Sequence, residues 1–268
     1  MDSIIKKDSG NTGKTLAVFC GVHGNEKAGV FAVEKILKNI ELTRGAVYFV
    51  FANPEAVKKN VRFVDKNLNR CFFDDQSGET YEEKRAIELM SLLDECDALL
   101  DIHASNNKET TPFAITDNGA EVVSNMDFTI VATGFNKIEP GGTDGYMKRK
   151  NTIGICLECG YSGESEKNTD LAYNSILQFL QYYNCIESII PMGRVAQKAL
   201  HVDDVQKVTS EEFELTQTFA DFQTIEAGRV IAEDESRKYV ADKERVILFG
   251  SQGKPIGAEA YILGNWVS

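Results

Sequence analysis

Long apolar segments are missing from this 268-residue sequence. None of its apolar runs reaches the roughly 18 residues that a helix needs to cross a bilayer. The first eight residues, Met1 to Asp8, also lack the apolar core of a secretory signal peptide. We therefore expect a cytoplasmic protein with no membrane partner.

An excess of positive charge is missing as well. The sequence has 29 lysine and arginine residues against 41 aspartate and glutamate residues, which gives a net charge of −12. A protein that binds nucleic acid needs a basic face for the phosphates, so no nucleic-acid partner is expected. A few arginines in one cleft can still bind a small anionic substrate.

Cysteine is sparse, with six residues in the whole chain. Without a secretion signal, these residues are expected to be buried thiols and not disulfides. Cys156 and Cys159 form a single C-x-x-C pair. Because no second pair completes a four-cysteine zinc site, a redox or second-metal role is the less favoured interpretation.

Apolar strands alternate with amphipathic helices over the first two thirds of the sequence. Runs of apolar residues that end at glycine or polar residues are typical of buried strands, and the segments between them have helical spacing. A strand–helix–strand order predicts an α/β fold with parallel neighbouring strands. The expected strands are 16–20, 46–51, 97–103 and 153–160, and the expected helices are 28–39, 80–93, 120–128 and 168–183.

The pattern changes after Pro191, where short apolar runs are separated by glycine-containing turns. Such spacing predicts a small β domain. We expect an α/β domain over residues 1–188 and a β domain over residues 189–268. His201 has no companion residue there and is expected at the surface. A glycine-rich stretch, Gly141 to Gly145, is expected to be a flexible turn that borders a cleft.

Three candidate metal ligands follow two of the expected strands. His23 and Glu26 are three positions apart, so one turn brings them side by side, and His103 closes the strand that begins near residue 97. Open α/β sheets bind ligands beyond the carboxyl ends of their strands. Two histidines and a glutamate can hold Zn²⁺ with water in the fourth position. The alternative for each histidine alone is a capped or surface residue.

Polar residues near these strands suggest supporting roles. Glu158 ends an apolar strand, where a carboxylate is costly to bury unless it has a task such as general base catalysis. Arg62, Asn69 and Arg70 can form a fork for a carboxylate, or they can lie in solvated surface pairs. Asp101 points to the same side of its strand as His103, and it can orient that ligand or cap a neighbouring helix.

The motifs together resemble the succinylglutamate desuccinylase/aspartoacylase family of the zinc carboxypeptidase superfamily. They are His23-Gly24-Asn25-Glu26, Asn67-Leu68-Asn69-Arg70, Asp101-Ile102-His103 and Leu157-Glu158-Cys159-Gly160. The resemblance implies a three-layer α/β/α domain with a mixed central sheet, followed by a β domain that narrows access to the site. It also implies one zinc ion bound by His23, Glu26 and His103, with Glu158 as general base and acid. Arg62 would then polarise the scissile carbonyl, and Asn69 and Arg70 would hold the substrate carboxylate.

Two positions depart from the family's pattern. Asn67 stands where the family commonly has aspartate, and the second carboxylate-binding arginine has no clear counterpart. Arg149 is the assignment for that arginine, with Tyr146 and Tyr261 as pocket tyrosines. The expected reaction is hydrolysis of a small N-acyl amino acid, and the alternatives are a zinc carboxypeptidase or amidase that acts on peptides, or a ligand-binding protein without activity. The oligomeric state is left open, with a homo-oligomer among the alternatives.

Overall fold

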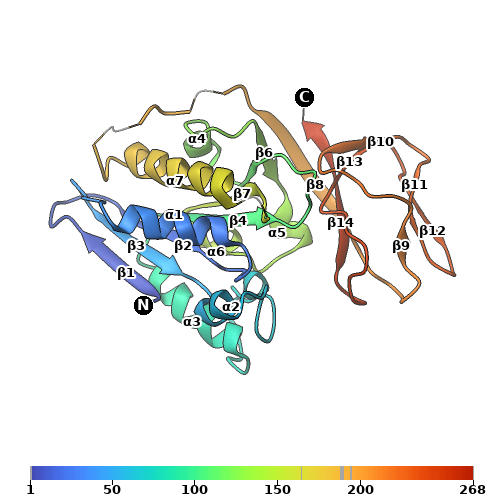
Figure 1. Ribbon diagram of the computed structural model, residues 1–268, viewed down its shortest axis with the longest axis horizontal. Helices are drawn as coiled ribbons and strands as arrows, with labels where there is room; N and C mark the ends of the chain where they lie inside the picture. The colour runs from blue at the N-terminus through green and yellow to red at the C-terminus, as the bar shows by residue number, and fades with distance from the viewer. Residues whose placement is uncertain (1, 164, 188–189, 194, 268) are drawn as a thin grey trace.

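A large mixed sheet runs through the computed structural model, which describes residues 2–163, 165–187, 190–193 and 195–267 (Figure 1). The sheet has eleven strands in the order β1-β3-β2-β4-β7-β5-β6-β8-β14-β13-β10. The strands are β1 (Ile4–Asp8), β2 (Thr15–Cys20), β3 (Ala46–Phe51), β4 (Ala98–Ser105), β5 (Phe113–Ile115), β6 (Ile130–Thr133), β7 (Ile153–Tyr161), β8 (Lys198–Lys207), β10 (Gln223–Ile225), β13 (Arg245–Leu248) and β14 (Glu259–Val267).

The middle of the sheet is parallel. β2 pairs in parallel with β3 on one side and with β4 on the other, and β4 pairs in parallel with β7. These strands are continuous apolar runs because helices cover both of their faces. α1 (Lys27–Leu37) connects β2 to β3, which confirms the predicted strand–helix–strand unit.

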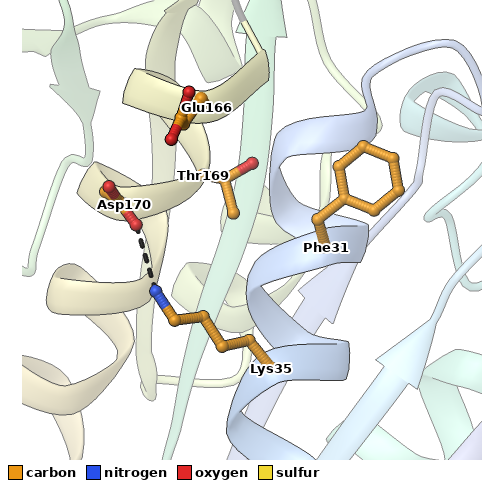
Figure 2. A pocket seen from close by; sticks show the side chains of 5 residues that line it. All are labelled: Phe31, Lys35, Glu166, Thr169 and Asp170. Carbon is orange, nitrogen blue, oxygen red and sulfur yellow. Dashed lines mark hydrogen bonds and ion pairs between the residues drawn. The ribbon is translucent and has the colours of Figure 1, made fainter.

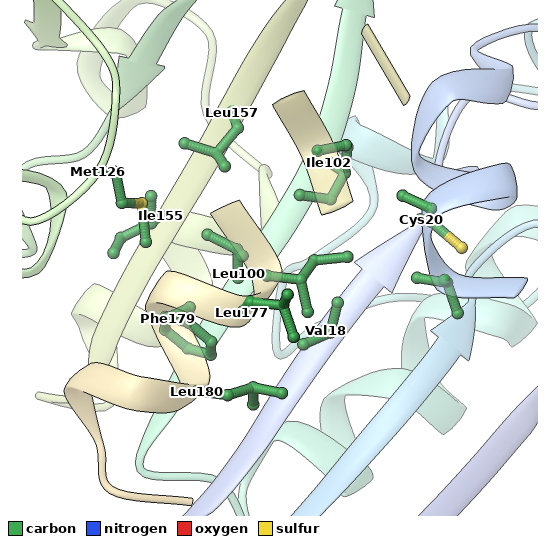
Figure 3. Close-up of a cluster of buried hydrophobic side chains, with 14 of the residues drawn as sticks. Val18, Cys20, Leu100, Ile102, Met126, Ile155, Leu157, Leu177, Phe179 and Leu180 are labelled. Atoms are coloured by element: carbon green, nitrogen blue, oxygen red, sulfur yellow. The ribbon is translucent and has the colours of Figure 1, made fainter. Parts of the chain in front are cut away.

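Alternate side chains of β2 enter two different hydrophobic layers. Leu16, Val18 and Cys20 pack with the first layer, and Ala17 and Phe19 with the second. Figure 3 shows the first layer, where side chains of α7 lie against β4 and β7. The first layer contains α1, α4 (Ala120–Val123) and α7 (Ser165–Tyr182), and the second contains η1 (Leu68–Arg70), α3 (Tyr81–Leu93) and α6 (Thr143–Arg149). The three-layer α/β/α prediction is confirmed.

The sheet continues into the C-terminal part of the chain. β8 pairs in parallel with β6, and β14, β13 and β10 follow it in antiparallel order. A separate three-stranded antiparallel sheet, β12-β11-β9, lies beyond them (Figure 1). Its strands are β9 (Glu214–Leu215), β11 (Val230–Glu233) and β12 (Lys238–Val240). The proposed boundary falls on residues 188 and 189, outside the described residues, so the division into two domains stays a prediction.

Two local predictions needed correction. The stretch from Gly141 to Gly145 is not simply a flexible turn, since α6 begins at Thr143 and the Thr143 amide donates to Asn69 Oδ1 at 3.2 Å. The helix expected over residues 120–128 ends at Val123. Two short elements follow the observed strands and were not predicted, namely α2 (Pro54–Lys59) and α5 (Phe135–Ile138).

The cysteines behave as buried thiols. All six are buried and unpaired. Cys156 and Cys159 are three positions apart on β7 and therefore point to opposite faces of the sheet, where they join different hydrophobic clusters. This arrangement separates the two thiols of the C-x-x-C motif. Among the described helices, none combines the length and apolarity that crossing a membrane requires.

Candidate metal centre and active site

Three parallel strands bring the predicted residues to one edge of the sheet. His23 follows the end of β2, and His103 lies near the end of the neighbouring β4. Glu158 lies on β7, where it pairs in register with His103. Because the carboxyl ends of parallel strands meet at one edge, residues far apart in the sequence converge there.

The side chains of His23, Glu26 and His103 form a tight, buried cluster. His23 Nδ1 lies 2.8 Å from Glu26 Oε1, His103 Nδ1 lies 3.1 Å from Glu26 Oε2, and the two Nδ1 atoms are 3.3 Å apart. Each residue is less than 5% exposed. Ligands about 2.0–2.1 Å from a tetrahedral zinc ion lie about 3.3 Å from one another. The cluster therefore fits a tetrahedral metal ion.

The outer nitrogen of each histidine has its own partner. His103 Nε2 lies 3.1 Å from Asp101 Oδ2, and His23 Nε2 lies 2.9 Å from Asn67 Oδ1. Thr143 Oγ1 also donates to Asp101 Oδ2, at 2.6 Å. Such partners fix a ligand's orientation and direct the lone pair of the other nitrogen inward. Of the two interpretations of Asp101, the structure supports orientation of His103.

Burial and neighbouring charges set the protonation of the site. Burial, together with the positive charge of Arg62, lowers the pKa of His23 to about 4, so the ring is neutral at pH 7. Metals bind the neutral form of imidazole. Burial also raises the pKa of Glu158 to about 8, together with the negative charge of Glu26. Glu158 Oε2 is enclosed and accepts no hydrogen bond from any residue that the structure describes.

The predicted polar loop also reaches the cluster. Arg62 Nη1 donates to Glu26 Oε1 at 3.0 Å, and the Arg62 side chain stays 40% exposed. Arg70 Nε donates to Glu139 Oε2 at 2.5 Å, while Arg70 Nη2 lies 3.9 Å from Glu259 Oε2 on β14. The loop is therefore linked both to the metal-ligand candidates and to the C-terminal part of the sheet.

Three residues that were predicted to bind substrate have their contacts in other parts of the fold, and their assignment stays a prediction. Arg149 donates to the carbonyl of Phe72 and stacks on aromatic rings of its own layer. Tyr146 is 1% exposed and donates to Asp94 at 2.6 Å. Tyr261 is buried in the hydrophobic cluster of the C-terminal sheets. Their contacts give all three side chains packing or hydrogen-bonding roles.

Two contacts of the site had no signal in the sequence. Glu139 follows α5 and is 69 positions from Arg70, and Asn67 is 44 positions from His23. No local spacing predicts either pair. His201, by contrast, is exposed as predicted and contacts Thr133 Oγ1 at 3.0 Å.

A separate surface pocket lies between α1 and α7 (Figure 2). Its lining includes an ion pair between Lys35 Nζ and Asp170 Oδ1 at 3.1 Å. The lining residues are Phe31, Lys35, Glu166, Thr169 and Asp170. None of them belongs to the candidate metal centre, so this pocket is not assigned to it.

A family model and individual relatives point to the same family for this chain. A family model described as the succinylglutamate desuccinylase/aspartoacylase catalytic domain matches residues 12–183. An aspartoacylase from Xenopus tropicalis is 34% identical over 135 residues, which cover 45% of this chain and 41% of the relative. A succinylglutamate desuccinylase from Pseudomonas fluorescens is 34% identical over 87 residues, 31% of this chain and 26% of the relative. These matches thus span less than half of either curated relative.

Solved structures show the same fold. The crystal structure of a succinylglutamate desuccinylase from Vibrio cholerae aligns with a TM-score of 0.83 and covers 98% of this chain and 85% of that one. The product-bound structure of the ectoine utilization protein EutE (DoeB) from Ruegeria pomeroyi aligns with a TM-score of 0.75, covering 97% of this chain and 88% of that one. The sequence identities are 18% and 17%, so this likeness concerns the fold alone.

Proposed function

This chain belongs to the succinylglutamate desuccinylase/aspartoacylase family, and on that premise we propose that it is a zinc-dependent amidohydrolase. Its reaction would remove the acyl group from a small N-acyl amino acid. The observation that carries the proposal is the convergence of His23, Glu26 and His103 at the spacing of a tetrahedral ion, with Glu158 on the adjacent strand. Relatives named aspartoacylase and succinylglutamate desuccinylase support the substrate class.

His23, Glu26 and His103 would hold one zinc ion, which when bound supplies an activated water and a Lewis acid. Glu158 would accept a proton from the attacking water and later donate it to the leaving amine. Its Oε2 has no hydrogen-bond partner among the described residues, and its raised pKa favours holding the proton until it is donated to the amine. The protein thus needs one carboxylate for both proton transfers.

Arg62 and the loop that follows it would bind the substrate. The guanidinium of Arg62 contacts the carboxylate of Glu26, and the Arg62 side chain is 40% exposed. It can therefore also reach the carbonyl oxygen of a substrate that is bound beside the candidate metal ligands. There it would stabilise the negative charge that develops in the tetrahedral transition state. Asn69 and Arg70 would hold the substrate carboxylate, with Glu139 orienting the guanidinium through its Nε.

The C-terminal part of the chain favours a small substrate over a peptide. Glu259 on β14 lies 3.9 Å from Arg70. Asp221, just before β10, accepts hydrogen bonds from Ser105, the last residue of β4, and from Asn107 just beyond it. These contacts bring Glu259 and Asp221, both from the C-terminal part of the chain, next to the polar loop and the end of β4. A zinc carboxypeptidase or amidase for peptides needs an open cleft there.

Metal analysis of the purified protein, followed by a panel of N-acyl amino acids and short peptides, tests the proposal. We expect about one zinc ion per chain and hydrolysis of N-acyl amino acids in preference to peptides. Glu158→Gln should keep the metal and lose turnover by about 10²- to 10⁴-fold, the usual contribution of a general base. Wild-type turnover in that variant would refute the assignment of the base. The cytoplasmic location expected from the sequence stays a prediction.

A further inference from the structure

We propose that Glu82 is a positioning residue that holds the loop over residues 61–70 in its working conformation. This loop carries Arg62, Asn69 and Arg70, to which substrate roles are assigned above, and Asn67, the partner of His23. The inference rests on the proposed function for those roles, but the contacts of Glu82 stand independently of it.

One buried carboxylate receives four hydrogen bonds. Glu82 is 0% exposed and lies in the first turn of α3. Its Oε1 accepts from the amide of Val64 at 2.7 Å and from Asn53 Nδ2 at 3.0 Å. Its Oε2 accepts from the amides of Asp65 at 3.0 Å and Lys66 at 3.2 Å. The two oxygens of a carboxylate offer about four acceptor positions, and all four are used here.

Three consecutive backbone amides thus share one acceptor group. Residues 61–67 form bends without a helix or strand, so no regular backbone ladder satisfies these amides. Successive amides that converge on an anion form a compact binding concavity, and here the anion is supplied by the protein itself. Each oxygen accepts two of the four bonds, so replacing one oxygen by an NH₂ group leaves two N–H groups without an acceptor. The loop is then no longer held in this conformation.

The part of the loop between Arg62 and Asn67 has few other anchors. The apolar side chains of Val61 and Phe63 are each 39% exposed, and the buried side chain of Leu68 anchors only the far end of the loop. Between these ends, the Tyr81 amide donates to Asp65 Oδ2 at 2.9 Å, and Lys66 Nζ donates to Glu83 Oε1 at 2.7 Å. The capping of α3 is a separate task, performed by Thr80 and Glu83. Glu82 therefore takes no part in capping α3, and three of its four hydrogen bonds come from the loop.

Glu82 also connects the loop to the first metal ligands. The side chain of Asn53 donates to Glu82, and its backbone amide donates to the carbonyl of Gly21 at 3.1 Å, two residues ahead of His23. On the other side, the Gly24 amide donates to the carbonyl of Arg62 at 3.2 Å. The loop and the turn that bears His23 and Glu26 are thus fixed relative to each other through this carboxylate.

The test compares Glu82→Gln with Glu88→Gln, a control on the same helix whose side chain is 57% exposed. Glutamine keeps the shape but replaces one acceptor oxygen with an NH₂ group that opposes the backbone amides. We expect amide hydrogen exchange at residues 64–66 to accelerate at least about tenfold in Glu82→Gln, with the amides of Leu89 and Met90 unchanged. We also expect kcat/KM for an N-acyl amino acid to fall on the order of tenfold to a hundredfold, because a small misplacement of Arg62 weakens catalysis steeply.

A double-mutant cycle with Arg62→Ala separates positioning from general stability. If Glu82 acts through the loop, its replacement should cost clearly less in the Arg62→Ala background than in the wild type. Additive effects, or exchange at residues 64–66 that does not change, would overturn the inference. If Glu82→Gln does not fold, hydrogen exchange of the wild-type protein tests the inference. Fast exchange of the amides of residues 64–66 would then contradict a role of Glu82 in holding the loop. An inactive, zinc-free wild type would instead refute the proposed function and leave the exchange result to judge Glu82.

Discussion

Replacing Asp101 with asparagine should weaken zinc binding without unfolding the protein. Asp101 is 0% exposed, and its Oδ2 accepts hydrogen bonds from His103 Nε2 and from Thr143 Oγ1. Asparagine has nearly the same shape, so packing is kept. The substitution removes the negative charge of the Asp101 carboxylate. That charge makes His103 Nδ1 a stronger electron donor toward a metal.

The size of the effect follows from this single contact. Replacing the outer partner of a metal-bound histidine usually costs 10- to 100-fold in metal affinity, which corresponds to about 1.4–2.7 kcal/mol. In this variant His23 keeps its own partner, Asn67. Zinc binding should therefore become weaker but should not be lost. We therefore expect the zinc dissociation constant to rise within that range.

Competition with a chromophoric zinc chelator measures the dissociation constant directly, and circular dichroism confirms that the variant is folded. Asp97→Asn is a matched control. Asp97 lies just before the start of β4, away from His103, and accepts hydrogen bonds from Lys14 Nζ and from the Thr15 amide. This substitution should leave the zinc affinity unchanged. Wild-type affinity in folded Asp101→Asn would show that the contact with His103 does not support a metal ligand, which refutes the reasoning.

Two further predictions concern the other partner of the metal ligands and the acid stability of the fold. Asn67→Asp should tighten zinc binding by about tenfold, because it places a carboxylate beside His23 Nε2; unchanged or weaker binding in the chelator assay would contradict this. The pKa of Glu83 is lowered from 4.5 to about 2, chiefly by the hydrogen bond from Lys66 and by the backbone of Thr80. A carboxyl group whose pKa is lower in the folded state stabilises the fold above its unfolded-state pKa, and this stabilisation is lost as the pH falls from about 4.5 towards 2. The midpoint of thermal unfolding should therefore fall over this range more steeply in the wild type than in Glu83→Gln, and parallel curves would refute the contribution of Glu83.

Local sequence patterns predicted the strands that carry the chemistry. The run from Leu16 to Cys20 is apolar throughout, and so is most of the run before His103, because both faces of these strands are covered by helices. Polar residues that directly follow such runs must lie at the carboxyl edge of a parallel sheet. For this reason the convergence of His23, Glu26 and His103 could be inferred from local patterns, whereas the assignment of Glu158 beside them also rested on the resemblance to the family.

The direction of individual side chains was not predictable in this way. Arg149 and Tyr146 are close in sequence to the expected pocket, but α6 turns them into the layer formed with α3, where Phe72 and Asp94 bind them. A helix of seven residues that begins in a glycine-rich stretch has no periodic signal strong enough to reveal that orientation.

The distant groups that complete the site became visible only in the folded chain. Glu82 binds amides up to 18 positions away, Glu139 binds Arg70, and Asn67 instead of a charged residue faces His23. Sequence periodicity shows which face of a helix or strand is buried, because apolar residues recur once per turn of a helix or at every second position of a strand. A hydrogen bond between two loops leaves no such repeat, since it depends on where folding brings two single side chains.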